Sequence, residues 1–314
     1  MISILDIKDA FDRISGHIHK TPILSSKTID RLVGAEVLFK CENLQKTGSF
    51  KIRGATNAVK QLSTSQLSNG IATVSSGNHG AALSVAGTRI NTPVTVIMPS
   101  NTSKIKIENV KRSGGNIVWC EPYQKSREQT LEKVVSDTGA AVIHPYNDAR
   151  VIAGQGTAGL EIVSDYPEID AIITPVSGGG LLSGTLLSAK YTNPKIKVYG
   201  AEPLEADDTF RSLQEGKIVP NKTTNTICDG LRAQVGSITF PIIQKYVDDI
   251  FIVNENDIVS SMQLIWSIMK IVVEPSSAIA LSALVSNKKQ LKGKTVAIIL
   301  SGGNVDLSNL PWAC

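Results

Sequence analysis

Residues 171–184 read AIITPVSGGGLLSG, an apolar run that is followed by three glycines and the start of a helical segment. The run has the length and the β-branched content of a strand that is buried on both faces. Consecutive glycines let main-chain N–H groups approach an anion closely, and the N-terminus of a helix adds a partial positive charge. The stretch therefore predicts a strand, a loop that can hold a phosphate, and a helix.

The same alternation of short apolar runs and helical segments continues along the whole chain. Strands are expected at residues 35–40, 70–76, 93–99, 116–121, 140–145, 171–177, 197–202, 249–254 and 295–301. Helices are expected at residues 51–59, 78–90, 126–138, 154–166, 184–192, 255–272 and 276–286. This order predicts an α/β protein with open, mainly parallel, twisted sheets and helices on both faces.

Three of the predicted strands run directly into unusual polar loops. These loops read SSGNHG, SGGGLLSG and SGGN, and they begin at Ser75, Ser177 and Ser301. Ligands of open α/β sheets bind beyond the carboxyl ends of the strands. We therefore expect the three loops to contribute to one binding site.

Composition limits the classes of protein to which the chain can belong. Of its 314 residues, 42% are hydrophobic and 19% are charged, which is typical of a globular enzyme and not of a disordered chain. The net charge is +4, and the basic residues are scattered among acids without a basic stripe, so no nucleic-acid partner is expected. No run of about 18 apolar residues predicts a membrane span.

The cysteines and the N-terminal residues give a prediction of location. The cysteines are Cys41, Cys120, Cys228 and Cys314, and their spacing matches neither CxxC nor a zinc site. This pattern favours a reducing compartment, and we expect a cytoplasmic protein. Residues 1–18 have apolar residues at helical spacing with acids among them, which is not the pattern of a signal peptide.

The glycine loop and Lys51 each allow two interpretations. The loop lacks the GxGxxG and GxxxxGK[ST] spacings, so it favours an isolated phosphate group over a dinucleotide or a P-loop ligand, or it binds nothing. Lys51, in the stretch KTGSFKIRGA, is either a solvated lysine at a helix start or a reactive amine. A phosphate site, a framed lysine and a polar strand end match the phosphate, aldehyde and ring nitrogen of pyridoxal phosphate.

The chain resembles the fold-type II pyridoxal-phosphate enzymes, the group of tryptophan synthase β, and within them the serine racemase and serine/threonine dehydratase family. Motifs of this family occur in family order: HKTPILSS, FKCENLQKTGSFKIRGA, SSGNHGAAL, VIAGQGT, SGGGLLSG, AEPLEADD, VVEPSSA and LSGGNVD. The resemblance implies a large cofactor-binding domain of residues 1–69 and 148–314. It also implies a small mobile domain of residues 70–147 inserted into the large one.

The resemblance also implies a role for each site residue. Lys51 would bond the aldehyde of the cofactor, with Phe50 beside the ring, Asn78 on the 3′-oxygen and Ser301 at the pyridine nitrogen. The phosphate would lie on the loop Ser177, Gly178, Gly179, Gly180 and Leu181. The substrate would lie on the loop Ser75, Ser76, Gly77, Asn78 and His79.

Ser76 matches the serine that faces the lysine across the substrate in serine racemases. Racemisation requires two acid/base groups on opposite faces of one Cα atom. The implied activity is the interconversion of L- and D-serine, with β-elimination of serine to a 2-oxo acid and ammonia, and threonine is a further candidate substrate. Ser76 can equally be a turn residue that binds the substrate carboxylate. This leaves a serine/threonine or 3-hydroxyaspartate dehydratase as the main alternative, and a Rossmann dehydrogenase or a non-catalytic amino-acid or nucleotide sensor as remote ones.

Two further sites follow from the resemblance. Glu202, Ala206 and Asp208 match a structural or activating Mg²⁺ or Ca²⁺ site, and the alternative is a solvated acidic helix cap. Ser26, Lys46, Thr47 and Asn304 match an effector site for ATP. In that effector site Lys27 and Thr28 replace the expected serine and isoleucine, and Ser113 stands where a tyrosine is expected. A homodimer is also implied.

Overall fold

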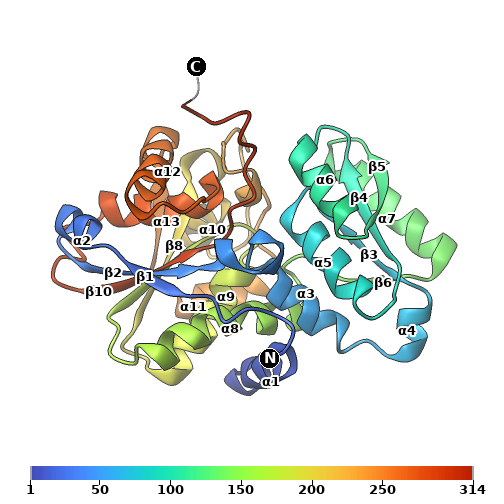
Figure 1. Ribbon diagram of the computed structural model, residues 1–314, viewed down its shortest axis with the longest axis horizontal. Helices are drawn as coiled ribbons and strands as arrows, with labels where there is room; N and C mark the ends of the chain where they lie inside the picture. Colours follow the sequence, from blue (N-terminus) through green and yellow to red (C-terminus); the bar gives the residue numbers. More distant parts are fainter. Residues whose placement is uncertain (1, 313–314) are drawn as a thin grey trace.

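The structure is a computed structural model that describes residues 2–312. The chain forms two sheets, which Figure 1 shows side by side with helices around them. The larger sheet has the strand order β1-β2-β10-β7-β8-β9, and within it β1 alone runs antiparallel to its neighbour. Its strands are β1 (Ile23–Ser25), β2 (Glu36–Cys41), β7 (Ala171–Pro175), β8 (Lys197–Pro203), β9 (Asp249–Val253) and β10 (Thr295–Leu300).

The smaller sheet is parallel throughout and has the order β5-β4-β3-β6. Its strands are β3 (Ile71–Val74), β4 (Val94–Pro99), β5 (Asn116–Cys120) and β6 (Ala141–Val142). The helices between these strands are α5 (Asn78–Thr88), α6 (Lys104–Arg112) and α7 (Gln124–Thr138). The predicted α/β class with mainly parallel sheets and helices on their faces is therefore confirmed.

The remaining helices come from the segments before and after the smaller sheet. They are α1 (Ile4–Ile14), α2 (Lys27–Val33), α3 (Lys51–Val59), α4 (Thr64–Ser68), α8 (Ala149–Asp165), α9 (Gly180–Thr192), α10 (Asp208–Glu215), α11 (Thr239–Tyr246), α12 (Glu255–Met269) and α13 (Pro275–Ser286). Short 3-10 turns are η1 (Glu42–Leu44), η2 (Lys46–Gly48), η3 (Leu204–Ala206) and η4 (Asp229–Leu231).

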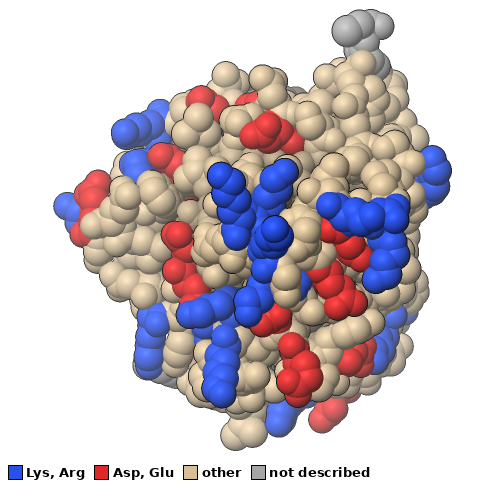
Figure 2. Space-filling model, turned by 90° about the vertical axis from the view of Figure 1, so that its left-hand side faces the viewer, with Lys and Arg blue, Asp and Glu red and all other residues tan. Residues whose placement is uncertain are grey.

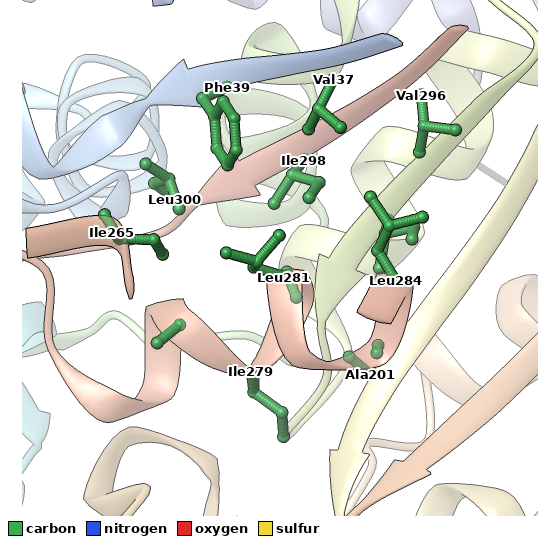
Figure 3. Close-up of a cluster of buried hydrophobic side chains, with 14 of the residues drawn as sticks. Val37, Phe39, Ala201, Ile265, Ile279, Leu281, Leu284, Val296, Ile298 and Leu300 are labelled. Atoms are coloured by element: carbon green, nitrogen blue, oxygen red, sulfur yellow. The ribbon is translucent and has the colours of Figure 1, made fainter. Parts of the chain in front are cut away.

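The main core lies between the six-stranded sheet and the C-terminal helices. Figure 3 shows side chains of β2 and β10, such as Phe39 and Ile298, pointing toward Leu281 and Leu284 of α13. Each of these side chains is fully buried. Burying a leucine or phenylalanine stabilises a fold by roughly 1.5–3 kcal/mol, so this contact fixes β10 and the polar loop that follows it.

A buried charged cluster anchors α3, the helix that begins with Lys51. The Arg53 guanidinium donates to Glu42 at 2.7 and 2.8 Å and to Glu161 of α8 at 2.7 and 2.9 Å. Lys40 of β2 donates to the same Glu161 at 2.5 Å. All four side chains are buried, and removing one partner from such a cluster leaves an uncompensated charge. The start of α3 is therefore held against β2 and α8.

The structure differs from the sequence prediction at a few element boundaries. The strand expected at residues 140–145 covers only Ala141–Val142, because the chain turns where His144 Nδ1 accepts the N–H groups of Tyr146 and Asn147. The helix expected at residue 154 begins at Ala149, because the Asp148 carboxylate accepts the Arg150 N–H at 2.9 Å as an N-cap. The strand β1 was not predicted, since three residues carry too little pattern.

The surface, the hydropathy of the helices and the cysteines add three findings. Figure 2 shows basic and acidic side chains mixed on the face of the molecule that it presents. Within residues 2–312, every helix is too short or too polar to cross a bilayer. Cys41, Cys120 and Cys228 are free and buried, and Cys314 lies outside the described residues.

Candidate active site

One pocket of about 900 Å³ lies between the two sheets and is lined from both of them. Its lining includes all three polar loops that follow β3, β7 and β10. The predicted residues in its wall are Phe50, Lys51, Ser75, Ser76, Gly77, Asn78, His79, Ser177, Gly178, Gly179, Gly180, Leu181 and Ser301. The fold thus brings together residues that are up to 251 positions apart in the sequence, as expected for the carboxyl ends of parallel strands.

The position of Lys51 is set by a second chain segment that runs beside it. The Phe50 N–H donates to the Ser301 carbonyl at 3.0 Å, and the Gly303 N–H donates to the Gly48 carbonyl at 2.9 Å. Ser49 and Gly302 form an isolated antiparallel bridge between these two bonds. The residues before Lys51 are therefore fixed directly to the loop that ends β10.

Lys51 has the electrostatics of a reactive amine. Its ammonium group donates to the Pro145 carbonyl at 3.0 Å and lies 5.0 Å from the centre of the Phe50 ring. Burial lowers the pKa of Lys51 to about 8, against the weaker effect of the Glu274 carboxylate. A lysine is nucleophilic only in its neutral form, which burial favours.

Two histidines near Lys51 are held neutral. Burial, together with the positive charge of Lys51, lowers the pKa of His79 to about 3 and that of His144 to about 4. His79 Nε2 lies 3.4 Å from the Ile143 carbonyl, while its Nδ1 atom is buried without a partner among the described residues. Neither ring therefore adds a positive charge beside Lys51 at neutral pH.

The glycine loop presents main-chain N–H groups to the pocket. No acceptor within residues 2–312 bonds the N–H groups of Gly178 and Gly179, and Gly179 has a φ of +87° at the N-cap of α9. The ring of Tyr146 lies against Gly178, where an added Cβ would come within 2.2 Å of it. Ser177 Oγ accepts the Ala233 N–H at 3.1 Å, which fixes the start of the loop. The loop is a preformed set of donors at the N-terminus of a helix, which suits an anion.

The loop of residues 75–79, called the substrate loop because the substrate is predicted to lie on it, is organised differently. Ser75 Oγ accepts the N–H groups of Gly77 at 3.2 Å and Gly80 at 3.0 Å, so that it caps α5. The Ser76 side chain is exposed to the pocket, and no hydrogen bond joins it to the described residues. Ser76 is thus the free hydroxyl of the pair, and Ser75 is the structural one.

Asn78 belongs to a polar network that the sequence did not predict. Its Nδ2 donates to Glu274 Oε1 at 2.7 Å, and its Oδ1 accepts from Asn304 Nδ2 at 2.8 Å. Asn304 Nδ2 also lies 2.8 Å from the Thr47 carbonyl. One N–H of the Asn78 amide remains available to a ligand.

Glu274 and Lys106 are the pocket residues that sequence reasoning missed. Burial raises the pKa of Glu274 to about 7, partly offset by Lys106. Lys106, on α6, forms an ion pair with Asp229 of η4 and lies 4.0 Å from Glu274. Glu274 lies in the quoted motif VVEPSSA, which was the available signal. Lys106 carried no signal, because it is one of several lysines on an amphipathic helix.

Ser301 lies at the end of β10, buried at the floor of the pocket. Its hydroxyl donates to the Ser276 carbonyl at 3.4 Å, which is a long and weak bond. The hydroxyl can therefore turn toward a ligand at small cost.

The predicted cation ligands lie close together beside the site. Glu202 accepts the N–H groups of Thr209 at 3.1 Å and Phe210 at 2.9 Å, and Asp208 accepts that of Val235 at 2.7 Å. Burial, together with the carboxylate of Asp208, raises the pKa of Glu202 to about 8. Asp208 Oδ1 is buried without a partner in the described chain. Within residues 2–312 no three His, Cys, Asp or Glu side chains form a metal cluster, so a carbonyl such as that of Ala206 and water would have to complete the shell.

The predicted nucleotide residues are only partly assembled. Thr47 and Asn304 are in contact, and Lys46 Nζ donates to the His17 carbonyl at 2.9 Å. Ser26 Oγ accepts the Ile29 N–H at 3.5 Å as the N-cap of α2. The role of the four residues toward ATP stays a prediction.

Comparison with known proteins places the chain in a family. The model of the family "pyridoxal-phosphate dependent enzyme" matches residues 14–302. A serine racemase of Arabidopsis thaliana is 47% identical over 98% of this chain and 94% of that protein. A β-hydroxyaspartate dehydratase of Paracoccus denitrificans is 44% identical over 98% of both chains.

A solved structure of maize serine racemase is also similar to this chain. It is 45% identical, covers 98% of this chain and 95% of its own, and superposes with a TM-score of 0.96. The chain therefore belongs to the pyridoxal-phosphate dependent enzyme family, in the group that contains serine racemases and amino-acid dehydratases.

Proposed function

We propose that the protein is a serine racemase that also eliminates water from serine. The observation that carries this proposal is that one pocket holds Lys51, with a pKa of about 8, and the free hydroxyl of Ser76. The serine racemases at 45–47% identity support the choice of serine as the substrate. Removal and return of one proton need two such groups on opposite faces of Cα.

The residues of the pocket fit pyridoxal phosphate. The unpaired N–H groups of Gly178 and Gly179, with the N-terminus of α9, suit its phosphate. The lowered pKa of Lys51 suits a bond to its aldehyde, and the weakly bonded hydroxyl of Ser301 suits its ring nitrogen. The free N–H of Asn78 suits its 3′-oxygen.

In the proposed mechanism the chain moves protons. When bound, the cofactor supplies an electron sink for the bond that breaks at Cα. The Lys51 amine removes the Cα proton of L-serine, and Ser76 returns a proton to the opposite face to give D-serine. The main-chain donors of the substrate loop orient the substrate carboxylate. If the β-hydroxyl instead takes up the proton that Lys51 removed and leaves as water, the remaining 2-aminoacrylate is hydrolysed by water to pyruvate and ammonia.

Residues 70–147 are proposed to move as the small domain and to close over the substrate. The four strands of the smaller sheet, which all lie between residues 71 and 142, support this division. Closure excludes water from the reacting atoms. A homodimer, an ATP effector site and a cytoplasmic location remain predictions of the sequence pattern.

Glu202, Asp208 and the carbonyl of Ala206 are proposed to bind Mg²⁺ or Ca²⁺. The unpartnered Asp208 Oδ1 and the mutual repulsion of the two buried carboxylates support this, because a divalent cation would relieve both. Added Mg²⁺ or Ca²⁺ is expected to raise the melting temperature of the protein. The shift should vanish in Asp208→Asn and persist in Asp207→Asn, its half-buried neighbour that pairs with Arg211; equal shifts in both variants would contradict the site.

The activity is tested by assaying pyruvate and D-serine together. Purified protein with L-serine should yield both, and Lys51→Ala should lose both products and the visible absorbance band of the lysine-bound cofactor. Ser76→Ala should lose D-serine and keep pyruvate, whereas Ser75→Ala should keep both.

Other outcomes assign other functions. Pyruvate without D-serine in the wild type would make the protein a dehydratase. Ammonia from 3-hydroxyaspartate at a higher kcat/KM than from serine would match the activity named for the Paracoccus relative. No band and no product would leave a non-catalytic binding protein.

A further inference from the structure

The side chain of Lys106 extends across the pocket, from a helix beside the smaller sheet to acidic residues beside the larger sheet. It lies on α6, which belongs to the smaller sheet, yet its side chain is only 8% exposed. Its two acidic neighbours, Asp229 and Glu274, lie in η4 and directly before α13, which belong to the larger sheet. All three side chains line the active-site pocket.

The stem of Lys106 also covers the substrate loop. A Cβ built on Gly77 would lie 2.6 Å from Cδ and 3.2 Å from Cε of Lys106. The absence of a side chain at Gly77 is therefore what lets the lysine pass over the loop to reach Asp229. Gly77 has a φ of 172°, which any residue can adopt, so close approach rather than backbone strain explains the glycine.

The charge balance shows that Lys106 is a paired cation. Burial alone would lower its pKa, but the carboxylates of Asp229 and Glu274 outweigh burial and raise the pKa above the ordinary value. The ammonium group is therefore protonated near neutral pH and cannot act as a base. Lys51 differs, because burial dominates there and lowers the pKa.

A second bond across the same boundary involves the same acid. Asn78, in the substrate loop, donates to Glu274 Oε1 at 2.7 Å, while Glu274 Oε2 is buried without a hydrogen-bond partner in the described chain. Asn78 and Lys106 thus lie on helices beside the smaller sheet. Glu274 and Asp229 lie in segments beside the larger sheet. Both contacts exist only when the substrate loop lies against the larger sheet.

We propose that Lys106 is a positioning residue whose ion pair with Asp229 and Glu274 holds the substrate loop against the larger sheet while substrate is bound. This proposal rests on the proposed function, because the loop is taken to hold the substrate carboxylate. The ion pair forms as the two sheets approach, so it lowers the free energy of the closed state. Its loss should weaken substrate binding more than it slows the proton transfers at Cα.

The test compares Lys106→Met with Lys104→Met in the holoenzyme. Methionine keeps the stem over Gly77 and removes the charge, and Lys104 is an exposed lysine two positions earlier on the same helix. Lys106→Met should raise KM for L-serine about tenfold and change kcat by less than about threefold, as for a partly buried ion pair. Lys104→Met should match the wild type. Lys106→Arg should recover most of the substrate affinity that Lys106→Met loses.

A readout that does not require turnover separates this proposal from the proposed function. Hydrogen exchange of the amides of residues 75–79, measured with L-serine present, should be faster in Lys106→Met and unchanged in Lys104→Met. If the wild type turns over no serine, the same measurement with cofactor alone still tests whether Lys106 restrains the loop.

A double-mutant cycle tests the partner. Asp229→Asn and Lys106→Met should each raise KM about tenfold, and together about tenfold rather than a hundredfold, because one interaction is lost. The KM of the wild type should also rise with added sodium chloride, while that of Lys106→Met should not. The proposal would be overturned if the effects of the two substitutions on KM multiplied. It would also be overturned if Lys106→Met equalled Lys104→Met in both KM and hydrogen exchange.

Discussion

The glycine loop after β7 and the substrate loop after β3 follow the same strand–loop–helix pattern but are held in opposite ways. The glycine loop leaves the N–H groups of Gly178 and Gly179 unpaired and is braced from outside by Tyr146 and Ala233. The substrate loop instead pairs two N–H groups internally, because Ser75 Oγ accepts those of Gly77 and Gly80. Its Asn78 side chain contacts Glu274 beside the larger sheet, and Lys106 of α6 passes over the loop to reach Asp229.

The difference separates a rigid binding site from a movable one. Unpaired buried donors are costly, so a loop that keeps them must be held by the surrounding fold and offers a ready site for an anion. A loop whose hydrogen bonds are internal can move without breaking them and needs only side-chain contacts to dock. We therefore expect damage to the glycine loop to abolish cofactor binding, and damage to the substrate loop to change substrate binding.

The largest expected effect is that of Gly178→Ala. The new Cβ would overlap the Tyr146 ring, so either the ring or the loop has to move. We expect the affinity for pyridoxal phosphate to fall by at least about a hundredfold, since aligned charge-assisted hydrogen bonds are lost. Equilibrium titration of the visible band measures this.

The control for this change is Gly16→Ala, where nothing lies within 4 Å of the added Cβ. The double variant Gly178→Ala/Tyr146→Ala should recover part of the affinity, because the clash is removed. Wild-type affinity in Gly178→Ala would show that the glycine loop is not rigid.

The next effect is the pH dependence of cofactor uptake. With a pKa of about 8, the neutral fraction of Lys51 rises with pH and levels off above about pH 8. The rate at which the apo protein gains the visible band should therefore rise roughly tenfold per pH unit below pH 8, as for any single titrating group. A rate that keeps rising to pH 10 would indicate that Lys51 is solvated in the apo protein.

A smaller effect is expected for Asn304→Ala, which removes the bridge between Thr47 and Asn78. Two lost hydrogen bonds should cost about 1–3 kcal/mol of the free energy of unfolding, measured by denaturant titration. KM for serine should rise, because Asn78 loses one of its two anchors. If the variant loses only a response to added ATP and keeps its stability and KM, Asn304 belongs to an effector site instead.

The smallest effect is expected for Ser75→Ala. The hydroxyl accepts the N–H groups of Gly77 and Gly80 at the start of α5, and the loss of these bonds should cost about 1 kcal/mol of the free energy of unfolding. Racemisation and elimination should both continue, in contrast to Ser76→Ala. If Ser75→Ala loses D-serine formation, the acid/base group is Ser75 and not Ser76.

Much of the fold and many of the residues that line the pocket could be predicted from local sequence pattern. The apolar runs placed the strands from β2 to β10 within one or two residues at most ends, and the glycine run marked a loop that lines the pocket. The exceptions were short or depended on a side chain, such as the turn that His144 imposes after β6. Three residues of β1 pair with β2 only because the tertiary fold brings them there.

The sequence by itself determined the parallel sheets, the three polar strand ends and the residues Lys51 and Ser76, because these depend on periodicity, glycine spacing and motif order along the chain. Only the tertiary structure decided that the Ser76 hydroxyl is free of the described residues, that burial lowers the pKa of Lys51, and that Lys106 reaches Asp229. The physical reason is that burial and charge pairing are set by partners distant in the sequence: Asn78 and its acceptor Glu274 are 196 positions apart. No local pattern specifies such a contact, and the pKa values of the site follow from it.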